Sequence, residues 1–325
     1  MNFESLCETF KNQGKYSVKK LPANLFFLYH NKFLCYYSLL SEDIMLKIKF
    51  YTVITILLFP LLLHAGIERI VSISPLQTES IYLLGAEDKL VGNTTYCIRP
   101  EAAKSITKIG DLVNISVEKI ISLRPDLVLT TKMTRRESIE KLISLGIRVE
   151  VFDQANEYDE ICKHFLRLAD LLDKRALAEK IVSKSREDVR DILKSSGSFK
   201  KYRVFVQIGA SPLFTVNKDS FIHDYITMSG GINIAAEARS GIYNREEVLY
   251  ADPDVVIITD MGIDTLNEIK IWEKYRHLNA VKNNRIYTIE TYIVCSPNPV
   301  TYVTALKEFI RLIQGENSPE GKKDE

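Results

Sequence analysis

Residues 118–130, EKIISLRPDLVLT, and residues 246–258, EEVLYADPDVVII, carry one pattern twice. Each copy combines a short helical segment, a Pro-Asp turn and a run of aliphatic residues that is typical of a buried strand. Three residues recur 128 positions later, namely Glu118 as Glu246, Pro125 as Pro253 and Asp126 as Asp254. One such copy is common in α/β proteins, but two copies in the same order predict two similar lobes.

The segments around both copies alternate between strand and helix patterns. In the first half we expect strands at 69–74, 89–92, 126–131 and 148–152, and helices at 76–84, 117–123 and 136–145. In the second half we expect strands at 202–208, 254–259 and 285–289, and a closing helix at 300–313. This alternation predicts an α/β fold with a largely parallel sheet in each half.

Residues 158–195, between the two halves, contain neither glycine nor proline. An uninterrupted helix of this length would span about 50 Å. Two interpretations are open: one helix that runs from lobe to lobe, or two helices that break near Asp173 and pack on one core. The two copies of the repeat lie on either side of this segment, which agrees with two similar lobes under either interpretation.

Composition excludes several classes of protein. The chain has 325 residues and a formal net charge of +1, from 43 Lys and Arg against 42 Asp and Glu. Because there is no basic excess to neutralise phosphates, we expect no nucleic-acid partner. The five cysteines and five histidines lack the CxxC, HxxxH and HxH spacings of zinc sites, so we expect no metal site.

Residues 45–65 match a secretory signal peptide. They have a basic start, an uncharged apolar run at 50–63 and a small residue, Ala65, at the cleavage position. The run is shorter than the roughly 20 residues that a membrane span needs. We expect Met45 to be the true initiator and the mature chain to begin at Gly66 in the periplasm. The alternative is that residues 1–44 are a genuine extension, followed by a retained anchor.

Three cysteines remain after residue 65, namely Cys97, Cys162 and Cys295. An odd number of cysteines cannot all pair internally in an oxidising compartment. Free buried thiols are one interpretation, and a bridge between Cys97 and Cys295 is the other.

Motifs along most of the mature chain point to a known family. In order they are RIVSISP at 69–75, TE at 78–79, LGA at 84–86, VG at 91–92, YC at 96–97, SLGI at 144–147, GGINI at 230–234 and RE at 245–246, together with the two Pro-Asp segments. With this order and spacing, residues 69–313 resemble the class III periplasmic substrate-binding proteins of ABC importers, which bind vitamin B12 and iron–siderophores.

The resemblance implies two Rossmann-like α/β lobes joined by one long backbone helix, with the ligand cleft between the lobes. We expect the N-terminal lobe at 66–156, the bridging helical segment at 157–198, the C-terminal lobe at 199–314 and a disordered tail at 315–325.

By the same resemblance, loops after the strands line the cleft. Tyr96 and Phe214 match aromatic residues of the family's cleft, and Tyr243 and Tyr292 lie in corresponding loops of the second lobe. Two cations, Arg99 and Arg239, lie in or near candidate loops. For each of these residues, the alternative is an ordinary core or surface position.

A corrinoid of the cobalamin type presents a broad apolar face and a polar rim, which aromatic walls with a few polar groups would fit. The family's B12 binders often carry Trp in the cleft loops, whereas the only Trp here, Trp272, lies outside them. The alternative ligand is a ferric siderophore or haem, whose anionic oxygens would face Arg99 and Arg239. Either ligand is a metal chelate that is carried, and we expect no resident cofactor.

Glu118 and Glu246 match the family's docking residues, one on each lobe, which contact arginines of the membrane permease. Two carboxylates at equivalent places would give a two-point, salt-dependent contact with the permease dimer. The alternative is a pair of solvated glutamates, favoured by the dipole in the first turn of a helix.

The leading hypothesis is therefore a monomeric extracytoplasmic receptor that feeds an ABC importer. No GxSxG, P-loop or HExxH motif occurs, and no carboxylate pair suggests a glycosidase, so we expect neither an enzyme nor a catalytic residue. A membrane-anchored sensor is a less favoured alternative.

Overall fold

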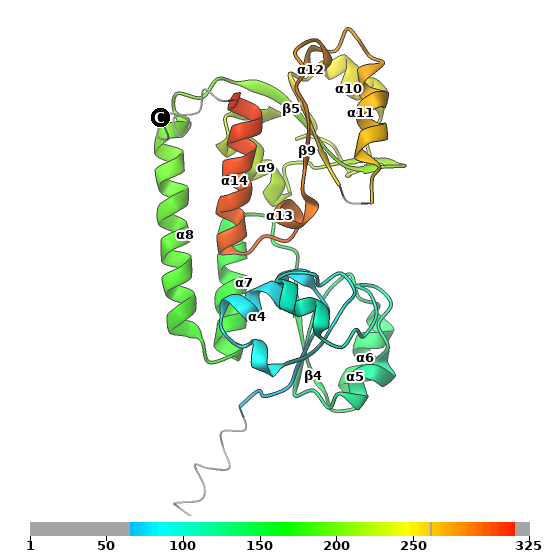
Figure 1. Cartoon of the computed structure of the whole chain (residues 1–325), viewed down its shortest axis with the longest axis vertical. Helices are drawn as coiled ribbons and strands as arrows, with labels where there is room; N and C mark the ends of the chain where they lie inside the picture. The colour runs from blue at the N-terminus through cyan, green and yellow to red at the C-terminus, as the bar shows by residue number, and fades with distance from the viewer. Residues whose placement is uncertain (1–65, 261, 316–325) are drawn as a thin grey trace, which may run out of the picture. The chain divides into compact units, whose positions relative to one another are not determined.

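A computed structural model of the chain describes residues 66–260 and 262–315, shown coloured along the chain in Figure 1. The expected initiator and signal segment before residue 66 and the tail after residue 315 lie outside the described residues. Residues 66–315 belong to one compact unit that contains two sheets.

The sheet of the N-terminal lobe has four parallel strands in the order β2-β1-β3-β4. The strands are β1 Ile70–Ser72, β2 Leu90–Asn93, β3 Leu127–Thr131 and β4 Arg148–Phe152. The helices of this lobe are α4 Pro75–Leu83, α5 Val117–Ser122 and α6 Arg136–Ser144, with 3-10 turns η2 Glu87–Lys89 and η3 Glu101–Ser105. Every strand that the sequence predicted in this half is confirmed, within three residues at each end.

The sheet of the C-terminal lobe is built around β5, which β8 and β9 extend in parallel on one side. Parallel β7 and antiparallel β6 pair with successive parts of β5. The strands are β5 Tyr202–Ala210, β6 Leu213–Thr215, β7 Gly231–Asn233, β8 Val255–Thr259 and β9 Ile286–Ile289. The helices are α9 Phe221–Met228, α10 Arg245–Ala251, α11 Thr265–Glu273, α12 Asn279–Lys282, α13 Thr291–Cys295 and α14 Pro299–Gln314.

The repeated sequence pattern has a repeated geometry. The Asp126 and Asp254 backbone N–H groups donate to the carbonyls of Arg69 and Arg203. In return, each aspartate Oδ2 accepts from the N–H of that same arginine, at 2.9 and 2.8 Å. Each aspartate therefore ties the start of one central strand to the start of its neighbour.

The turn before each proline also repeats. Arg124 and Asp252 have left-handed φ values of 47° and 44°. The helices that precede these turns, α5 and α10, begin alike, because Ser116 and Asn244 accept hydrogen bonds from the third helical residue as N-caps. The prediction of two similar lobes is thus confirmed down to single hydrogen bonds.

The connection between the lobes corrects the expectation of one long helix. It consists of two helices, α7 Tyr158–Leu171 and α8 Arg175–Ser196, which pack against each other. Asp173 has a left-handed φ of 57°, and the Lys174 N–H donates to the Ala169 carbonyl at 2.8 Å. These features end α7 as glycine-type helix stops do. Figure 1 shows α7 and α8 beside α14, which contacts both.

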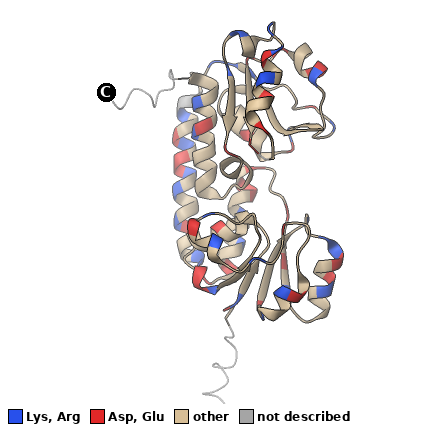
Figure 2. Ribbon diagram, turned by 45° about the vertical axis from the view of Figure 1, so that its right-hand side comes forward, with Lys and Arg blue, Asp and Glu red and all other residues tan. Residues whose placement is uncertain are grey.

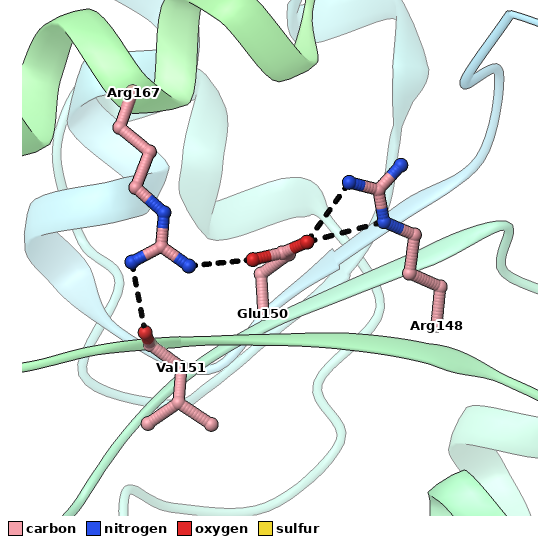
Figure 3. Close-up of polar contacts among 4 residues, drawn as sticks. All are labelled: Arg148, Glu150, Val151 and Arg167. Atoms are coloured by element: carbon pink, nitrogen blue, oxygen red, sulfur yellow. Dashed lines mark hydrogen bonds and ion pairs between the residues drawn. The ribbon is translucent and has the colours of Figure 1, made fainter.

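Glu150 joins the N-terminal sheet to this helical layer (Figure 3). Its carboxylate accepts from Arg148 on the same strand, β4, at 2.9 Å and from Arg167 on α7 at 2.6 Å. Partial burial disfavours the charged form, but the hydrogen bonds from the two arginines outweigh it and lower the pKa of Glu150. The Arg167 guanidinium also covers the ring of Phe152, 4.7 Å from its centroid. The end of β4 and α7 are therefore fixed together.

The core and surface follow the sequence pattern. A single cluster of buried apolar residues includes residues of both sheets and of α7, α8, α9 and α14. Lys, Arg, Asp and Glu residues intermingle along the outer helix α8, as Figure 2 shows, with pairs such as Lys184 and Asp188 at 2.9 Å. Cys97, Cys162 and Cys295 are all free, so a bridge between Cys97 and Cys295 is not present.

Candidate ligand site and docking surface

Arg99 and Tyr292 meet although they lie in different lobes. Arg99 follows β2, and Tyr292 follows β9, so both lie near the carboxyl ends of parallel strands, where α/β proteins bind ligands. The Arg99 guanidinium donates to Glu290 and lies 5.0 Å from the centroid of the Tyr292 ring. Tyr292 is in the first turn of the short helix α13 rather than in the predicted loop.

Glu79 on α4 joins this cluster, and the sequence reasoning missed it as a site residue. Burial raises the pKa of its carboxyl, while the nearby Arg99 charge acts in the opposite direction. Burial, and then the charge of Glu79, raise the pKa of the Tyr292 phenol. Glu79 Oε2 and the Tyr292 hydroxyl are buried and have no hydrogen-bond partner among the described residues. Such orphaned polar atoms are suited to bind a ligand or an ordered water.

Tyr96 lies three residues before Arg99, in the same loop. Its side chain is 57% exposed, unusual for a large aromatic residue. Phe214 on β6 is 37% exposed, and its ring lies against the backbone of Gly209. A Cβ at Gly209 would lie 2.9 Å from Phe214 Cβ, so only glycine leaves room for this ring.

Arg239 and Tyr243 lie in the loop between β7 and α10, which pairs with β6 through Phe214 and Ile242. Arg239 is exposed and makes no ion pair with any residue in the described part of the chain. Tyr243 is half-buried, and its ring centroid lies 6.0 Å from that of Phe205 in the lobe's core. Within residues 66–260 and 262–315, no hydrogen bond, ion pair or ring contact joins this group to the cluster around Arg99.

Glu118 and Glu246 both occupy the second position of their helices, α5 and α10. Glu118 is 76% exposed and pairs with Lys141 on α6 at 3.1 Å. A hydrogen bond from its own backbone N–H, and then the Lys141 ammonium, lower the pKa of Glu118. Glu246 is also exposed, but no cation in the described part of the chain pairs with it. The two carboxylates are thus equivalent in place and different in surroundings.

Two further observations concern residues 66–260 and 262–315. No group of three or more His, Cys, Asp or Glu residues in these ranges is placed to hold a metal ion. None of the helices described there has the length and apolar character needed to cross a membrane.

Comparison with known proteins identifies the family. The sequence profile of the family described as "Periplasmic binding protein" matches residues 70–292. The chain belongs to this family. This membership confirms the resemblance on which the sequence analysis relied, since the matched range contains both Pro-Asp segments and every candidate site residue.

Sequence relatives of this periplasmic binding protein include an uncharacterised ABC transporter substrate-binding lipoprotein, YvrC, of Bacillus subtilis. It is 29% identical over 240 residues, which are 71% of this chain and 76% of the relative. The vitamin B12-binding protein of Yersinia pestis is 29% identical over 208 residues, which are 63% of this chain and 74% of the relative.

Solved structures give the same family. The periplasmic vitamin B12 binding protein BtuF of Vibrio cholerae has a TM-score of 0.66 and 25% identity, covering 76% of this chain and 97% of its own. A possible iron-binding periplasmic solute-binding protein of Staphylococcus epidermidis has a TM-score of 0.68 and 27% identity, covering 76% of this chain and 99% of its own. This periplasmic binding protein is therefore an extracytoplasmic substrate-binding component of an ABC importer and not an enzyme.

Proposed function

We propose that this periplasmic binding protein captures a corrinoid of the cobalamin type and delivers it to its ABC permease. The choice of ligand rests on one observation, namely which candidate side chains are exposed and which are already paired. Tyr96 and Phe214 keep apolar ring surface exposed, whereas the Arg99 cation is already paired with Glu290 and stacked on Tyr292. Exposed aromatic faces, together with a cation that is already paired, suit a neutral corrinoid with amide groups on its rim.

The similarity to relatives named for vitamin B12 binding supports the same choice. The second candidate is a ferric siderophore or haem. Arg239 favours it, because it is an exposed cation without an ion pair in the described part of the chain and could face anionic oxygens. The similarity to the possible iron-binding protein of Staphylococcus epidermidis supports this candidate as well.

Calorimetric titration with cyanocobalamin, dicyanocobinamide, haem, ferrichrome and ferric enterobactin decides between the two ligands. We expect sub-micromolar binding of a corrinoid, about 1 µM corresponding to 8 kcal/mol of binding free energy. Tyr96→Ala and Phe214→Ala should each weaken corrinoid binding by about tenfold, as truncation of an aromatic contact does. Tyr250→Ala is the matched control, since it removes a 95% exposed tyrosine on α10, outside the candidate site.

Arg239→Ala tests the second candidate. If the ligand is a ferric chelate or haem, this variant should lose about tenfold or more in affinity, because a charge-assisted hydrogen bond disappears. Arg276→Ala, which removes an exposed arginine after α11, is the control for lost charge. Binding of haem or a ferric siderophore, with no response to cyanocobalamin or dicyanocobinamide, would overturn the corrinoid proposal.

Glu118 and Glu246 are proposed to dock this protein, as a monomer, onto the permease dimer. Their equivalent positions on two similar lobes support a two-point contact that weakens as salt screens it. The double variant Glu118→Ala/Glu246→Ala should bind ligand normally and lose ligand uptake. Normal uptake by the double variant would refute docking through these residues.

We also propose that residues 45–65 are a signal peptide through which the protein is exported. Met45 is the proposed initiator, and cleavage is proposed between Ala65 and Gly66. The lobes are proposed to span 66–156 and 199–314, with the bridging segment at 157–198. Amino-terminal sequencing of the native protein tests the proposed initiator and cleavage site, since a native chain that still contains residues 1–44 would contradict them.

A further inference from the structure

A buried polar network anchors α10, the helix that carries Glu246. Arg245 is the first residue of this helix, and its Nη2 donates to Glu268 Oε2 on α11 at 2.7 Å. Glu268 is only 5% exposed. The Arg245 guanidinium carbon also lies 4.6 Å from the centroid of the Trp272 ring. A carboxylate and an indole therefore both hold this arginine.

The network continues into the central strand of the lobe. Gln207 on β5 donates through Nε2 to Glu268 Oε2 at 2.9 Å, and its Oε1 accepts from Trp272 Nε1 at 2.8 Å. Gln207 and Trp272 are fully buried. One chain of hydrogen bonds thus connects the start of α10 to α11 and to β5, and buried networks of this kind rigidify the elements that they connect.

The N-terminal lobe holds its equivalent helix by other means. The 128-residue offset places Val117 at the position of Arg245. Ile73 is the counterpart of Gln207. Each lies four residues after the arginine, Arg69 or Arg203, that is hydrogen-bonded to the repeated aspartate of its lobe. Val117 and Ile73 belong to an apolar cluster, so at these two positions apolar packing takes the place of the buried polar network. The exposed carboxylate of Glu118 forms an ion pair with Lys141. Among the described residues, no cation forms such a pair with Glu246.

Stability does not account for this difference. Buried ion pairs can often be replaced by well-packed apolar residues without loss of stability, and α5 shows that this fold accepts the apolar solution. One nitrogen of Arg245, Nη1, is buried without a hydrogen-bond partner in the described residues. What the network provides instead is a fixed orientation for the first turn of α10.

We propose that Arg245 is a positioning residue for the docking carboxylate of Glu246. The two residues are adjacent, and the Asn244 side chain accepts from the backbone N–H of Glu247 at 2.7 Å. With the guanidinium fixed on Glu268 and Trp272 and the cap fixed by Asn244, the first turn has one orientation in which it presents Glu246 to the permease. This inference rests on the proposed docking role of Glu246.

A double-mutant cycle tests the proposal. The affinity of the purified full chain for the source organism's ABC permease in nanodiscs is measured for Arg245→Met in three backgrounds. We expect Arg245→Met to lower the affinity for the permease about tenfold in the wild-type and Glu118→Ala backgrounds. In Glu246→Ala we expect a loss of less than about twofold, because the group through which Arg245 acts is already absent.

Three controls separate positioning from general damage to the fold. Binding of the corrinoid probe cyanocobalamin should stay within about twofold for Arg245→Met, while hydrogen exchange of the α10 amides should become faster and that of α5 should not change. Arg245→Lys keeps the cation beside Glu268 but cannot reproduce the planar stacking. Its affinity for the permease should fall only about threefold. If the Met variant is unstable, Arg245→Lys replaces it in the cycle. Arg175→Met, which removes an exposed arginine on α8, should not alter permease affinity.

The outcomes distinguish this inference from the docking proposal. An equal loss for Arg245→Met in all three backgrounds would overturn the positioning role, as would unchanged permease affinity where Glu246→Ala alone weakens binding. If Glu246→Ala alone has no effect, the docking role of Glu246 fails and the positioning role fails with it.

Discussion

Glu79 illustrates what decides whether a candidate site residue can be predicted from the sequence. Tyr96, Arg99 and Tyr292 could be proposed from residue type and from motif position, and the structure places Arg99 and Tyr292 in contact. Glu79 stands in a motif of the first helix, but only the folded chain buries it beside Arg99 and Tyr292. The contacts that define the cluster join residues about 200 positions apart, and no local pattern records them.

The raised pKa of Glu79 gives a pH-dependent prediction. Its pKa lies above the ordinary value of 4.5 in the folded state, because burial disfavours the charged form. The folded state therefore holds this proton more tightly than the unfolded state does. The resulting stabilisation is complete below about pH 4.5 and is lost as the pH rises through the folded pKa.

Glu79→Gln removes this titration and should change the pH profile of stability. From pH 4 to pH 7, the free energy of unfolding of the wild type should fall relative to that of the variant, as measured by urea unfolding at several pH values. Glu87→Gln, at an exposed glutamate of the same lobe, reports the effect of one lost charge. A variant that loses stability relative to the wild type as the pH rises would show that pairing with Arg99 outweighs burial.

At the scale of elements, the sequence predicted the parallel strands well because hydrophobic runs and their turns are local signals. The expected strand at 148–152 coincides with β4, and the Pro-Asp turns begin β3 and β8 as predicted. Short elements such as β6, β7 and α13 were missed, because three to five residues carry too little periodicity.

The stop between α7 and α8 lies near Asp173, as the two-helix interpretation predicted, whereas the expectation of one long helix was wrong. The usual helix stop is a glycine in the left-handed conformation, and here Asp173 takes that place with a φ of 57°. The Lys174 to Ala169 hydrogen bond that completes the stop is made by backbone atoms, which any sequence could supply. An aspartate in a charged helical segment therefore allowed a break near Asp173 as one of two interpretations but did not decide between them.

Asp173→Gly should stabilise the protein, because glycine adopts the left-handed conformation without the steric cost that a Cβ imposes. We expect the free energy of unfolding to rise by about 0.5–1 kcal/mol in urea titrations, because relief of the left-handed conformation exceeds the entropy that glycine adds to the unfolded chain. Ser183→Gly is the matched control, since it places the same residue at an exposed position inside α8 and should cost about 0.5 kcal/mol. A loss of stability in both variants would contradict this account of the helix stop.

At the scale of the molecule, the largest apolar cluster of the described residues spans both lobes, and each lobe also has a smaller cluster of its own. The largest apolar cluster contains Ile70 and Leu129 of the first sheet and Val206 and Ile257 of the second. Helices α7, α8 and α14 contribute to the same cluster and contact one another. A large apolar interface of this kind opposes independent motion of domains. We therefore expect ligand binding to change the solution radius very little.

The same continuity predicts that both lobes unfold together. Trp272 is the only tryptophan and is fully buried in the C-terminal lobe, so its fluorescence reports on that lobe alone, whereas circular dichroism reports on the helices of both. The two signals should give coincident urea midpoints, as a cooperative transition requires.

Leu129→Ala empties a fully buried position in the N-terminal sheet and should cost about 2–5 kcal/mol. Trp272 lies in a separate cluster of the C-terminal lobe, but the largest cluster spans both lobes, so this distant change should move the Trp272 midpoint and the dichroism midpoint by the same amount. A Trp272 transition that stays in place while the dichroism becomes biphasic would show that the helical layer does not couple the lobes.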